Sequence, residues 1–431
     1  MKDNNKNRGI ETKAVQSGYT PKNGEPRVLP IYQSTTYKYD SSDFLGELFD
    51  LKSDGHMYSR ISNPTVSAVE AKIADMEGGI GALCTSSGQA ATFISIFNIT
   101  SCGQNIISST TIYGGSTNLL AVTMKRMGIE VRFVTPEMTD EEIEAQIDEN
   151  TRLFFGETIA NPVLKVFDIE RYAKLAHAHG IPLIVDNTFA TPVLCRPIEF
   201  GADVVIHSTT KYMDGHASVV GGVIVDSGNF DWSKGGKYPE LTTPDESYHG
   251  VVYTESFGKA AYITKARTQL MRDLGMTPMP MASYILNLGL ESLPLRIKRH
   301  SENALTVAKY LESSDKVAWV NYPGLESSPD ADLVKKYLPN GQSGVISFGV
   351  KGGREAAVKF MDALRLAQIV VHVADARTSV LHPASTTHRQ LTDEQLVDAG
   401  VSPDLIRMSI GIENVDDIIA DIEQALEISN K

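Results

Sequence analysis

The alternation of short apolar runs with amphipathic stretches between residues 78 and 227 is the feature that most limits how this chain can fold. The apolar runs are short and rich in β-branched and aromatic residues, as buried strands are, and the stretches between them space their apolar residues as helices do. Strands joined by helices lie parallel in one sheet, with helices on both faces, so the pattern predicts an α/β fold. The expected strands are residues 82–84, 106–107, 131–134, 153–155, 181–185 and 202–206, and the expected helices include 65–77, 90–98, 140–149 and 169–179.

The length of 431 residues exceeds what one compact core usually holds, so we expect two domains with appendages. Residues 1–60 contain prolines and glycines at short intervals and predict an irregular arm that docks on a partner subunit. Residues 61–274 are expected to form the sheet domain, with an insert at 227–258 that is rich in Gly, Pro and aromatic residues. Residues 275–431 predict a smaller α/β domain. Its expected strands are 317–321, 345–350 and 405–410.

The composition is typical of a soluble globular protein. Hydrophobic residues make up 42% of the chain, and the net charge of −13 disfavours a nucleic-acid or anionic-membrane partner. The cysteines Cys84, Cys102 and Cys195 lack the spacing of metal ligands, so we expect reduced thiols and no metal site. Residues 1–8 are polar with no apolar segment behind them, and no stretch is long enough to span a membrane. These patterns predict a cytoplasmic protein.

Lys211 and Asp186 follow two of the expected strands, at the points where polar residues begin. In an open α/β sheet, ligands bind beyond the carboxyl ends of the strands. An amine and a carboxylate side by side there suit pyridoxal 5'-phosphate (PLP), which forms a Schiff base with a lysine and needs an acidic partner for its ring nitrogen. Taken alone, the two residues fit ordinary polar positions at strand ends better than they fit a cofactor site.

Groups that suit a phosphate and an aromatic ring stand at other strand ends. The turn Ser86-Ser87-Gly88-Gln89 precedes a helix, whose N-terminus favours an anion, although N-capping alone also explains the turn. Ser208 and Thr210 flank the lysine and can donate hydroxyl groups to the same phosphate. Tyr113 can stack on a pyridine ring, or simply pack against the protein.

Glu157 and Asn161 follow another expected strand and can hydrogen-bond near the cofactor, although Asn161-Pro162 can equally be a plain turn. Each of these features is common, and their joint occurrence at successive strand ends favours a PLP site. A dinucleotide site is disfavoured because no G-x-G-x-x-G turn opens a strand–helix unit. A non-catalytic binding protein is disfavoured because the lysine, the acid and the aromatic residue are all present.

Motifs spread over nearly the whole chain resemble the Cys/Met-metabolism family of PLP-dependent enzymes, and the lysine segment is the most specific of them. The motifs are Tyr58-Ser59-Arg60 with Asn63-Pro64, Ser86 to Ala91, Ile184 to Thr188 and His207 to Gly222. The resemblance implies the PLP-dependent transferase fold of type I, which is aminotransferase-like. That fold has a large, mostly parallel sheet domain and a smaller C-terminal α/β domain.

The resemblance also implies roles for single residues. Lys211 would hold PLP, Asp186 would pair with its ring nitrogen, and Tyr113 would stack on the ring and assist the leaving group. Tyr58 and Arg60 would reach the phosphate of the neighbouring subunit, which implies a homodimer with shared active sites and, from the family, a homotetramer. Further residues at the cofactor would be Ser87, Gly88, Gln89, Ser208, Thr210, Thr188, Asn161 and Glu157.

Arg407 would grip the α-carboxylate of an amino-acid substrate, because guanidinium geometry matches a carboxylate. Tyr58 would lie at the substrate as well. His372 stands where the family leads us to expect Ser or Asn, so it is either a substrate contact or an ordinary structural histidine.

The implied reaction is a γ-replacement, in which sulfide or a thiol replaces the acetate of O-acetyl-L-homoserine and L-homocysteine is formed for methionine biosynthesis. The stretches behind this expectation are Tyr248-His249-Gly250, Asn321 to Glu326 and His382 to His388. Methionine or cystathionine γ-lyase and cystathionine γ-synthase are the alternatives on the same scaffold. Gly115 argues against a methionine γ-lyase, which characteristically carries a cysteine there. The acyl group, acetyl or succinyl, stays open.

Overall fold

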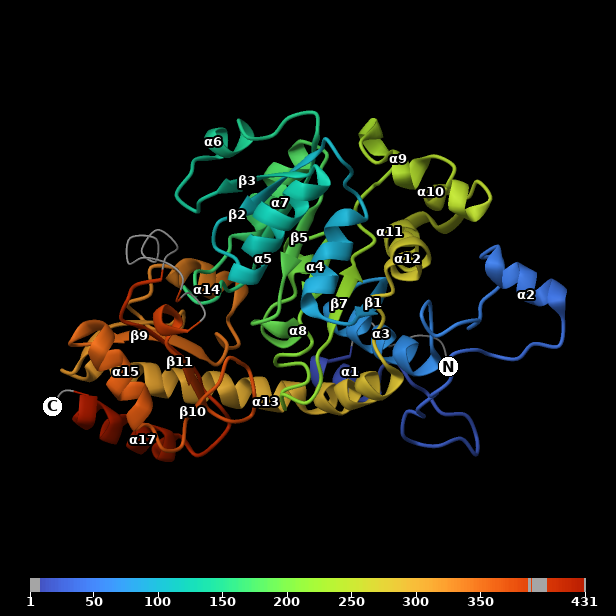
Figure 1. Cartoon of the computed structure of the whole chain (residues 1–431). Coiled ribbons are helices and arrows are strands. Elements are labelled where there is room, and N and C mark those ends of the chain that lie inside the picture. Colours follow the sequence, from blue (N-terminus) through green and yellow to red (C-terminus); the bar gives the residue numbers. More distant parts are fainter. Residues whose placement is uncertain (1–7, 387–388, 390–400, 430–431) are drawn as a thin grey trace.

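The computed structural model describes residues 8–386, 389 and 401–429, and these form two sheets with helices around them (Figure 1). Residues 1–7 of the polar start lie outside the described residues, as do Thr387 and His388 of the last family motif. Within the described ranges, no helix has the length and apolar character needed to cross a membrane.

The larger sheet has seven strands in the order β1-β7-β6-β5-β4-β2-β3. From β6 to β3 all neighbouring strands run parallel, as the alternation predicts. β7 is a strand that the alternation does not predict, and it runs antiparallel to both β1 and β6. It differs because it follows β6 through the lysine loop without a crossover helix. The strands are β1 (Gly81–Thr85), β2 (Asn105–Ser109), β3 (Glu130–Val134), β4 (Thr151–Glu157), β5 (Leu183–Asp186), β6 (Val204–His207) and β7 (Gly222–Asp226).

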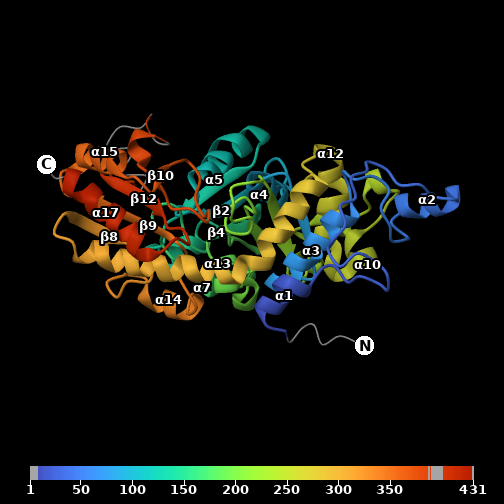
Figure 2. The ribbon, with the colours of Figure 1, turned by 90° about the horizontal axis from the view of Figure 1, so that it is seen from below.

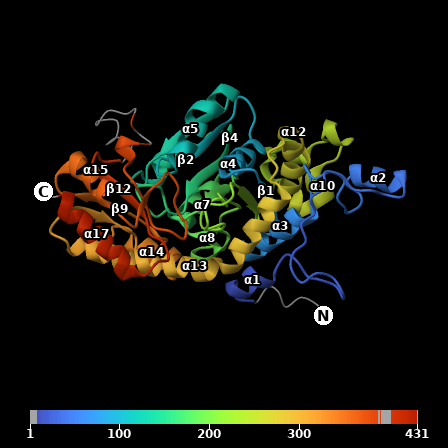
Figure 3. The ribbon, with the colours of Figure 1, turned by 60° about the horizontal axis from the view of Figure 1, so that its bottom comes forward.

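Helices cover both faces of this sheet, and consecutive strand residues point to opposite faces. Val185 and Val205 belong to the core cluster that includes α3 (Pro64–Glu77), α7 (Ile169–Ala178) and α13 (Pro280–Ser313). Ile184 and Ile206, one residue away, belong to the cluster that includes α4 (Gly88–Phe97). Figure 3 shows α4 and α5 on one side of the strands and α8 and α13 on the other. The other helices around the sheet are α5 (Gly114–Asn118), α6 (Asp140–Glu144), α8 (Thr191–Leu194), α9 (Pro239–Thr242), α10 (Tyr253–Phe257), α11 (Ala261–Lys265) and α12 (Arg272–Leu274).

The N-terminal segment is less irregular than its prolines and glycines suggest, because it contains α1 (Ile10–Gln16) and α2 (Ser42–Phe49). α1 packs on the same chain: Ala14 is fully buried in the cluster shared with α3 and α13, and Lys13 lies 3.2 Å from Asp75. α2 begins after Ser41, whose hydroxyl caps it by accepting the N–H of Phe44. α2 stands away from the rest of the chain, on the side opposite the C-terminal domain (Figure 1).

The C-terminal domain is built on the 34-residue helix α13, which extends from the large sheet to the second sheet and packs against both (Figure 2). The second sheet has the order β10-β11-β12-β9-β8, and it contains the three expected strands of this domain. Its strands are β8 (Val317–Asn321), β9 (Val345–Val350), β10 (Gln368–Ile369), β11 (Ser379–Leu381) and β12 (Leu405–Ser409), and its helices are α14 (Ala331–Tyr337), α15 (Gly353–Ala363) and α17 (Val415–Ser429).

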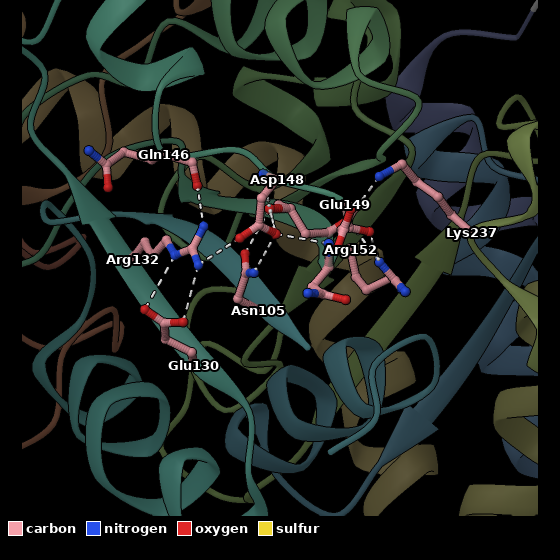
Figure 4. A network of polar contacts seen from close by, with 10 residues as sticks. Asn105, Glu130, Arg132, Gln146, Asp148, Glu149, Arg152 and Lys237 are labelled. Carbon is pink, nitrogen blue, oxygen red and sulfur yellow. Dashed lines mark hydrogen bonds and ion pairs between the residues drawn. The ribbon is translucent and has the colours of Figure 1, made fainter. Parts of the chain in front are cut away.

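A polar network closes the amino-terminal edge of the strands, opposite the edge where the motifs lie (Figure 4). Arg132 forms an ion pair with Asp148 at 2.8 Å and donates to the carbonyl of Gln146 at 2.7 Å. Asp148 accepts from the side chain of Asn105 at 2.8 Å. The chain turns at this network, and α6 accordingly stops at Glu144 rather than reaching the expected residue 149.

Candidate active site

The carboxyl ends of β4, β5 and β6 bring most of the expected site residues together. Glu157 and Asp186 are register partners at the ends of β4 and β5. Thr188 joins Asp186 to the next strand end, because its hydroxyl donates to Asp186 Oδ1 at 2.5 Å and accepts the N–H of Ser208 at 2.8 Å. Lys211 lies in the turn that follows, where its N–H donates to the carbonyl of Ser208. The sheet therefore gathers residues from three strands at one edge.

Asp186 has a carboxyl group that accepts hydrogen bonds and has no cationic partner among the described residues. Burial raises its pKa, and the hydrogen bonds from Thr188 and the charge of His207 oppose that rise. Within the described residues Asp186 forms no ion pair, and both Thr188 donors go to its Oδ1 atom. A protonated ring nitrogen is a partner that such a carboxylate stabilises, so Asp186 fits the role expected of it with PLP.

Lys211 is placed to act as an amine nucleophile. Burial, together with the positive charge of Arg407, lowers the pKa of Lys211 to about 8. The free-amine fraction near neutral pH is therefore much larger than for an ordinary lysine, as the attack on an aldehyde requires. Lys265 also has a pKa lowered to about 8, but its ammonium group donates to the carbonyl of Asn98 at 3.0 Å, away from the strand ends.

A backbone cradle for a phosphate forms where α4 begins. A Cβ atom on Gly88 would lie 2.6 Å from the Cβ of Ser208, so only glycine allows the α4 N-terminus to approach the lysine loop this closely. The hydroxyl of Ser87 accepts the N–H of Ala90 and therefore caps the helix. Thr210 exchanges hydrogen bonds with Gly221 through its hydroxyl. Ser208 and the first N–H groups of α4 are thus the cradle's best anion donors.

Tyr113 lies beside this cradle, with its side chain half exposed. Its N–H donates to Glu157 Oε2 at 2.6 Å, and its ring lies over Gly115, where a Cβ would come within 2.4 Å of Cε1. The amide of Gln89 lies 2.9 Å from the same Cβ position. Burial, and then the charge of Asp186, raise the pKa of Glu157 well above its usual range.

Arg407 enters the site from the centre of the second sheet and is 8% exposed. Its Nη1 donates to Asn161 Oδ1 at 3.1 Å and its Nη2 donates to the carbonyl of Val371 at 3.3 Å. Its Nε atom is buried without a hydrogen-bond partner among the described residues. Burial lowers the pKa of Arg407 to about 10, and it stays cationic at neutral pH. A buried guanidinium with an unpaired donor suits the recognition of a carboxylate.

His372 lies next to Val371, on the segment that Arg407 contacts. Burial, followed by the charge of Lys211, lowers the pKa of His372, so its imidazole is neutral at pH 7. Its Nε2 atom is buried and has no partner in the described part of the chain. The charge of Lys211 therefore acts on His372, and Arg407 contacts the backbone carbonyl of the residue before it.

The structure does not bring Tyr58 and Arg60 into this cluster. The guanidinium of Arg60 lies 5.3 Å from the centroid of the Tyr58 ring, and it donates to the carbonyl of Arg272. Tyr58 is 41% exposed. Across the described residues, neither side chain forms a hydrogen bond with Lys211 or Ser208. Within one subunit, the two residues form an exposed pair of their own.

Arg296 is a site residue that the sequence gives no signal for. It is buried on α13, and it donates to the carbonyls of Tyr212 at 2.8 Å and Met213 at 3.4 Å. The hydroxyl of Tyr212 in turn accepts the N–H of Gly344 at 2.9 Å. The backbone next to Lys211 is thereby fixed to both α13 and the C-terminal domain. Among the described residues, no cluster of His, Cys, Asp and Glu is suited to hold a metal ion.

The family model described as Cys/Met metabolism PLP-dependent enzyme matches residues 11–427. The homocysteine synthase of Schizosaccharomyces pombe is 48% identical over 97% of this chain and 98% of the relative. The O-acetyl-L-homoserine sulfhydrylase 1 of Thermus thermophilus is 46% identical over 97% of this chain and 99% of the relative.

A solved structure from Campylobacter jejuni, described as an O-acetylhomoserine (thiol)-lyase with N'-pyridoxyl-lysine-5'-monophosphate, superposes with a TM-score of 0.94. It is 37% identical and covers 97% of this chain and 100% of that structure's chain. The similarity therefore extends over both domains, and the type I fold expected from the sequence is confirmed.

Proposed function

Because the chain belongs to the Cys/Met metabolism PLP-dependent enzymes, we propose that it forms L-homocysteine and acetate from O-acetyl-L-homoserine and sulfide. The names of the S. pombe and T. thermophilus relatives, which match over nearly their whole length, support this reaction. The structural observation that carries the proposal is the convergence of Asp186, Lys211 and Arg407, in which Arg407 lies close enough to Lys211 to lower the pKa of its amine.

PLP, when bound, withdraws electrons from the substrate and makes its Cα and Cβ protons acidic. Asp186 keeps the ring nitrogen protonated, and Thr188 fixes the orientation of that carboxylate through its two hydrogen bonds. Ser208 and the N-terminus of α4 bind the phosphate, with Gly88 allowing their close approach. Tyr113 stacks on the ring, and Glu157 holds the backbone of Tyr113 in place.

Lys211 moves the protons of the reaction. As a free amine it takes one proton from Cα and one from Cβ before acetate leaves, and it returns one proton to each carbon after sulfide has added, which its pKa of about 8 suits. Acetate leaves from Cγ with the C–O electron pair, and sulfide forms the new C–S bond at the same carbon. Arg407 binds the α-carboxylate, so the substrate keeps one orientation through both halves of the replacement.

His372 contributes to substrate binding in this proposal. His372 follows Val371, whose carbonyl Arg407 contacts, and its neutral imidazole has an Nε2 with no partner among the described residues, so it can donate one hydrogen bond to the carboxylate that Arg407 binds. This neutral donor takes the place of the Ser or Asn expected from the family.

The proposed assembly is a homodimer with shared sites, within a homotetramer. In this proposal Tyr58 and Arg60 act at the phosphate of the neighbouring subunit, which accounts for their position outside the cluster of their own chain. Large apolar side chains on the same segment support docking on a partner, since Val28 is 62% and Phe49 is 56% exposed. The proposed location is the cytoplasm.

Product analysis of the PLP-loaded enzyme tests this function. The enzyme is incubated with O-acetylhomoserine and sulfide, and in parallel with O-succinylhomoserine and sulfide, with methionine and with cystathionine. The proposal predicts that homocysteine from the acetyl ester dominates. If 2-oxobutyrate and ammonia dominate instead, the enzyme is a γ-lyase and the proposal is wrong.

A further inference from the structure

A buried carboxylate lies on the far side of the sheet from the candidate active site. Glu77 is the last residue of α3 and is 0% exposed. Its Oε1 atom accepts hydrogen bonds from His207 Nε2 at 2.6 Å and from Asn187 Nδ2 at 3.0 Å. His207 and Asn187 are likewise fully buried, at the ends of β6 and β5.

The network extends to a third strand end. Thr158, directly after β4, donates its hydroxyl to Asn187 Oδ1 at 2.8 Å. Asn187 Nδ2 also donates to the carbonyl of Cys195 at 2.8 Å. One carboxylate on α3 is therefore connected, directly or through Asn187, to the ends of β4, β5 and β6.

Each of the three network residues at the strand ends is the immediate chain neighbour of a residue expected at the cofactor. Thr158 follows Glu157, Asn187 follows Asp186, and His207 precedes Ser208. Because successive strand residues point to opposite faces, the network lies on the α3 face while its neighbours lie on the α4 face. A shift of any network residue would therefore move the backbone that carries a cofactor contact.

The network contributes little net free energy to folding, because it buries polar atoms that lack hydrogen-bond partners. The Oε2 atom of Glu77 and the Nδ1 atom of His207 are buried and have no hydrogen-bond partner among the described residues. Buried ionisable pairs that are incompletely satisfied contribute no more than well-packed apolar side chains of similar volume. Stability alone therefore does not account for a Glu, a His and an Asn at this place.

We propose that Glu77 is a positioning residue that acts through His207 and Asn187 to hold the ends of β4, β5 and β6 in the arrangement that binds PLP. This proposal rests on the assignment of Glu157, Asp186 and Ser208 to the cofactor site. Glu77 touches neither PLP nor substrate in this account. Its effect is on how tightly and in which orientation the cofactor is held.

The test compares Glu77→Ala and Glu77→Gln in the full-length protein. PLP affinity of the apoprotein is measured by equilibrium dialysis, and the circular dichroism of bound PLP in the visible range reports how the ring is held. Glu77→Ala is expected to raise the Kd for PLP roughly tenfold and to change the dichroic band per bound PLP. Glu77→Gln keeps an oxygen that can accept both hydrogen bonds, so it should restore most of the affinity.

A matched control lies at the other end of β6. Asp203 pairs with His177 at 2.7 Å near the amino-terminal edge of the strand, away from the cofactor residues. Asp203→Asn is expected to lower thermal stability without changing PLP affinity or the dichroic band. If Glu77→Ala behaves as Asp203→Asn does, the network is structural only and the proposal is wrong.

Thr158→Val decides the question if Glu77→Ala does not fold. It removes one hydroxyl at nearly constant volume, and it leaves Glu77 and His207 in contact. We expect a Kd a few-fold higher than that of the wild type, and an unchanged Kd would contradict the proposal. A wild-type protein that takes up no PLP would instead overturn the assignment of the cofactor site itself.

Discussion

Arg407 Nη1 lies 3.1 Å from Asn161 Oδ1, and this hydrogen bond joins the C-terminal sheet to the carboxyl end of the large sheet at the active site. The guanidinium is carried by β12 of the C-terminal domain, and its orientation is fixed by a hydrogen bond to Asn161, which follows β4 of the large sheet. The charge of Arg407 lowers the pKa of Lys211, so the amine is electrostatically coupled to the guanidinium that we propose binds the substrate carboxylate.

Replacing Arg407 with Lys tests its role toward the substrate carboxylate. An ammonium keeps the charge but loses the planar pair of donors, and hydrogen bonds to charged groups contribute about 1.5–3 kcal/mol. We expect KM for O-acetylhomoserine to rise at least tenfold, with the absorbance of bound PLP unchanged. An unchanged KM would mean that another residue binds the carboxylate.

Gly115 provides room for the ring of Tyr113, and a side chain there is expected to displace it. A Cβ would lie 2.4 Å from Cε1, closer than van der Waals contact permits. Gly115→Ala should lower kcat for replacement by about ten- to a hundredfold, because a stacked or leaving-group-assisting Tyr113 would be misplaced. Gly115→Cys adds a thiol to the same clash, and we expect it to raise the ratio of 2-oxobutyrate to homocysteine above that of the wild type. Equal product ratios in both variants and the wild type would contradict a role for this glycine in reaction choice.

The rate at which apoprotein takes up PLP should depend on pH through Lys211. The free amine is the nucleophile, so the second-order rate constant should increase as pH rises towards about 8 and level off above it. Arg407→Met removes a neighbouring positive charge, so the midpoint should move to higher pH. Stopped-flow absorbance measures both profiles. A wild-type midpoint near the ordinary lysine value of 10.5 would be at odds with this account.

Asp148 should stabilise the amino-terminal edge of the sheet in a pH-dependent way. Burial alone would raise its pKa, but hydrogen bonds from Asn105 and Arg132 lower it to about 2. A carboxyl whose folded pKa is depressed stabilises the protein above its unfolded pKa, and this contribution is lost as pH falls through the folded value. Because the side chain of Asp148 is 41% exposed, we expect Asp148→Asn to cost only about 1 kcal/mol at pH 7. Urea midpoints should differ at pH 7 and converge towards pH 2.

The sequence was sufficient to predict which residues lie at the ends of neighbouring strands. The apolar run that ends at Asp186 and the segment around Lys211 place two groups at neighbouring strand ends, because parallel strands share one carboxyl edge. Short apolar runs rich in β-branched and aromatic residues likewise predicted the buried strands. These features depend on local periodicity, which the sequence displays directly.

Contacts between distant elements were out of reach. Arg296 meets the backbone after Lys211 across 84 positions of sequence, and nothing in its own helix distinguishes it from a surface arginine. Glu77 resembles an ordinary acidic residue at the end of a helix, and only the packing of α3 shows that it is buried against His207. β7 pairs antiparallel with β6 because no crossover helix separates the two strands along the chain, and its amino-acid composition does not reveal this. Periodicity indicates which face a residue lies on, but not which residue it meets.

The most direct test of the central claim is to reduce the PLP-loaded enzyme with borohydride and locate the pyridoxyl group by peptide mass spectrometry. Our account predicts that the label is on Lys211, and that Lys211→Ala carries none and makes no homocysteine. Lys265, with a similar pKa but bound to Asn98, should stay unlabelled. A label on Lys265 or on any other lysine, or full activity in Lys211→Ala, would contradict the account.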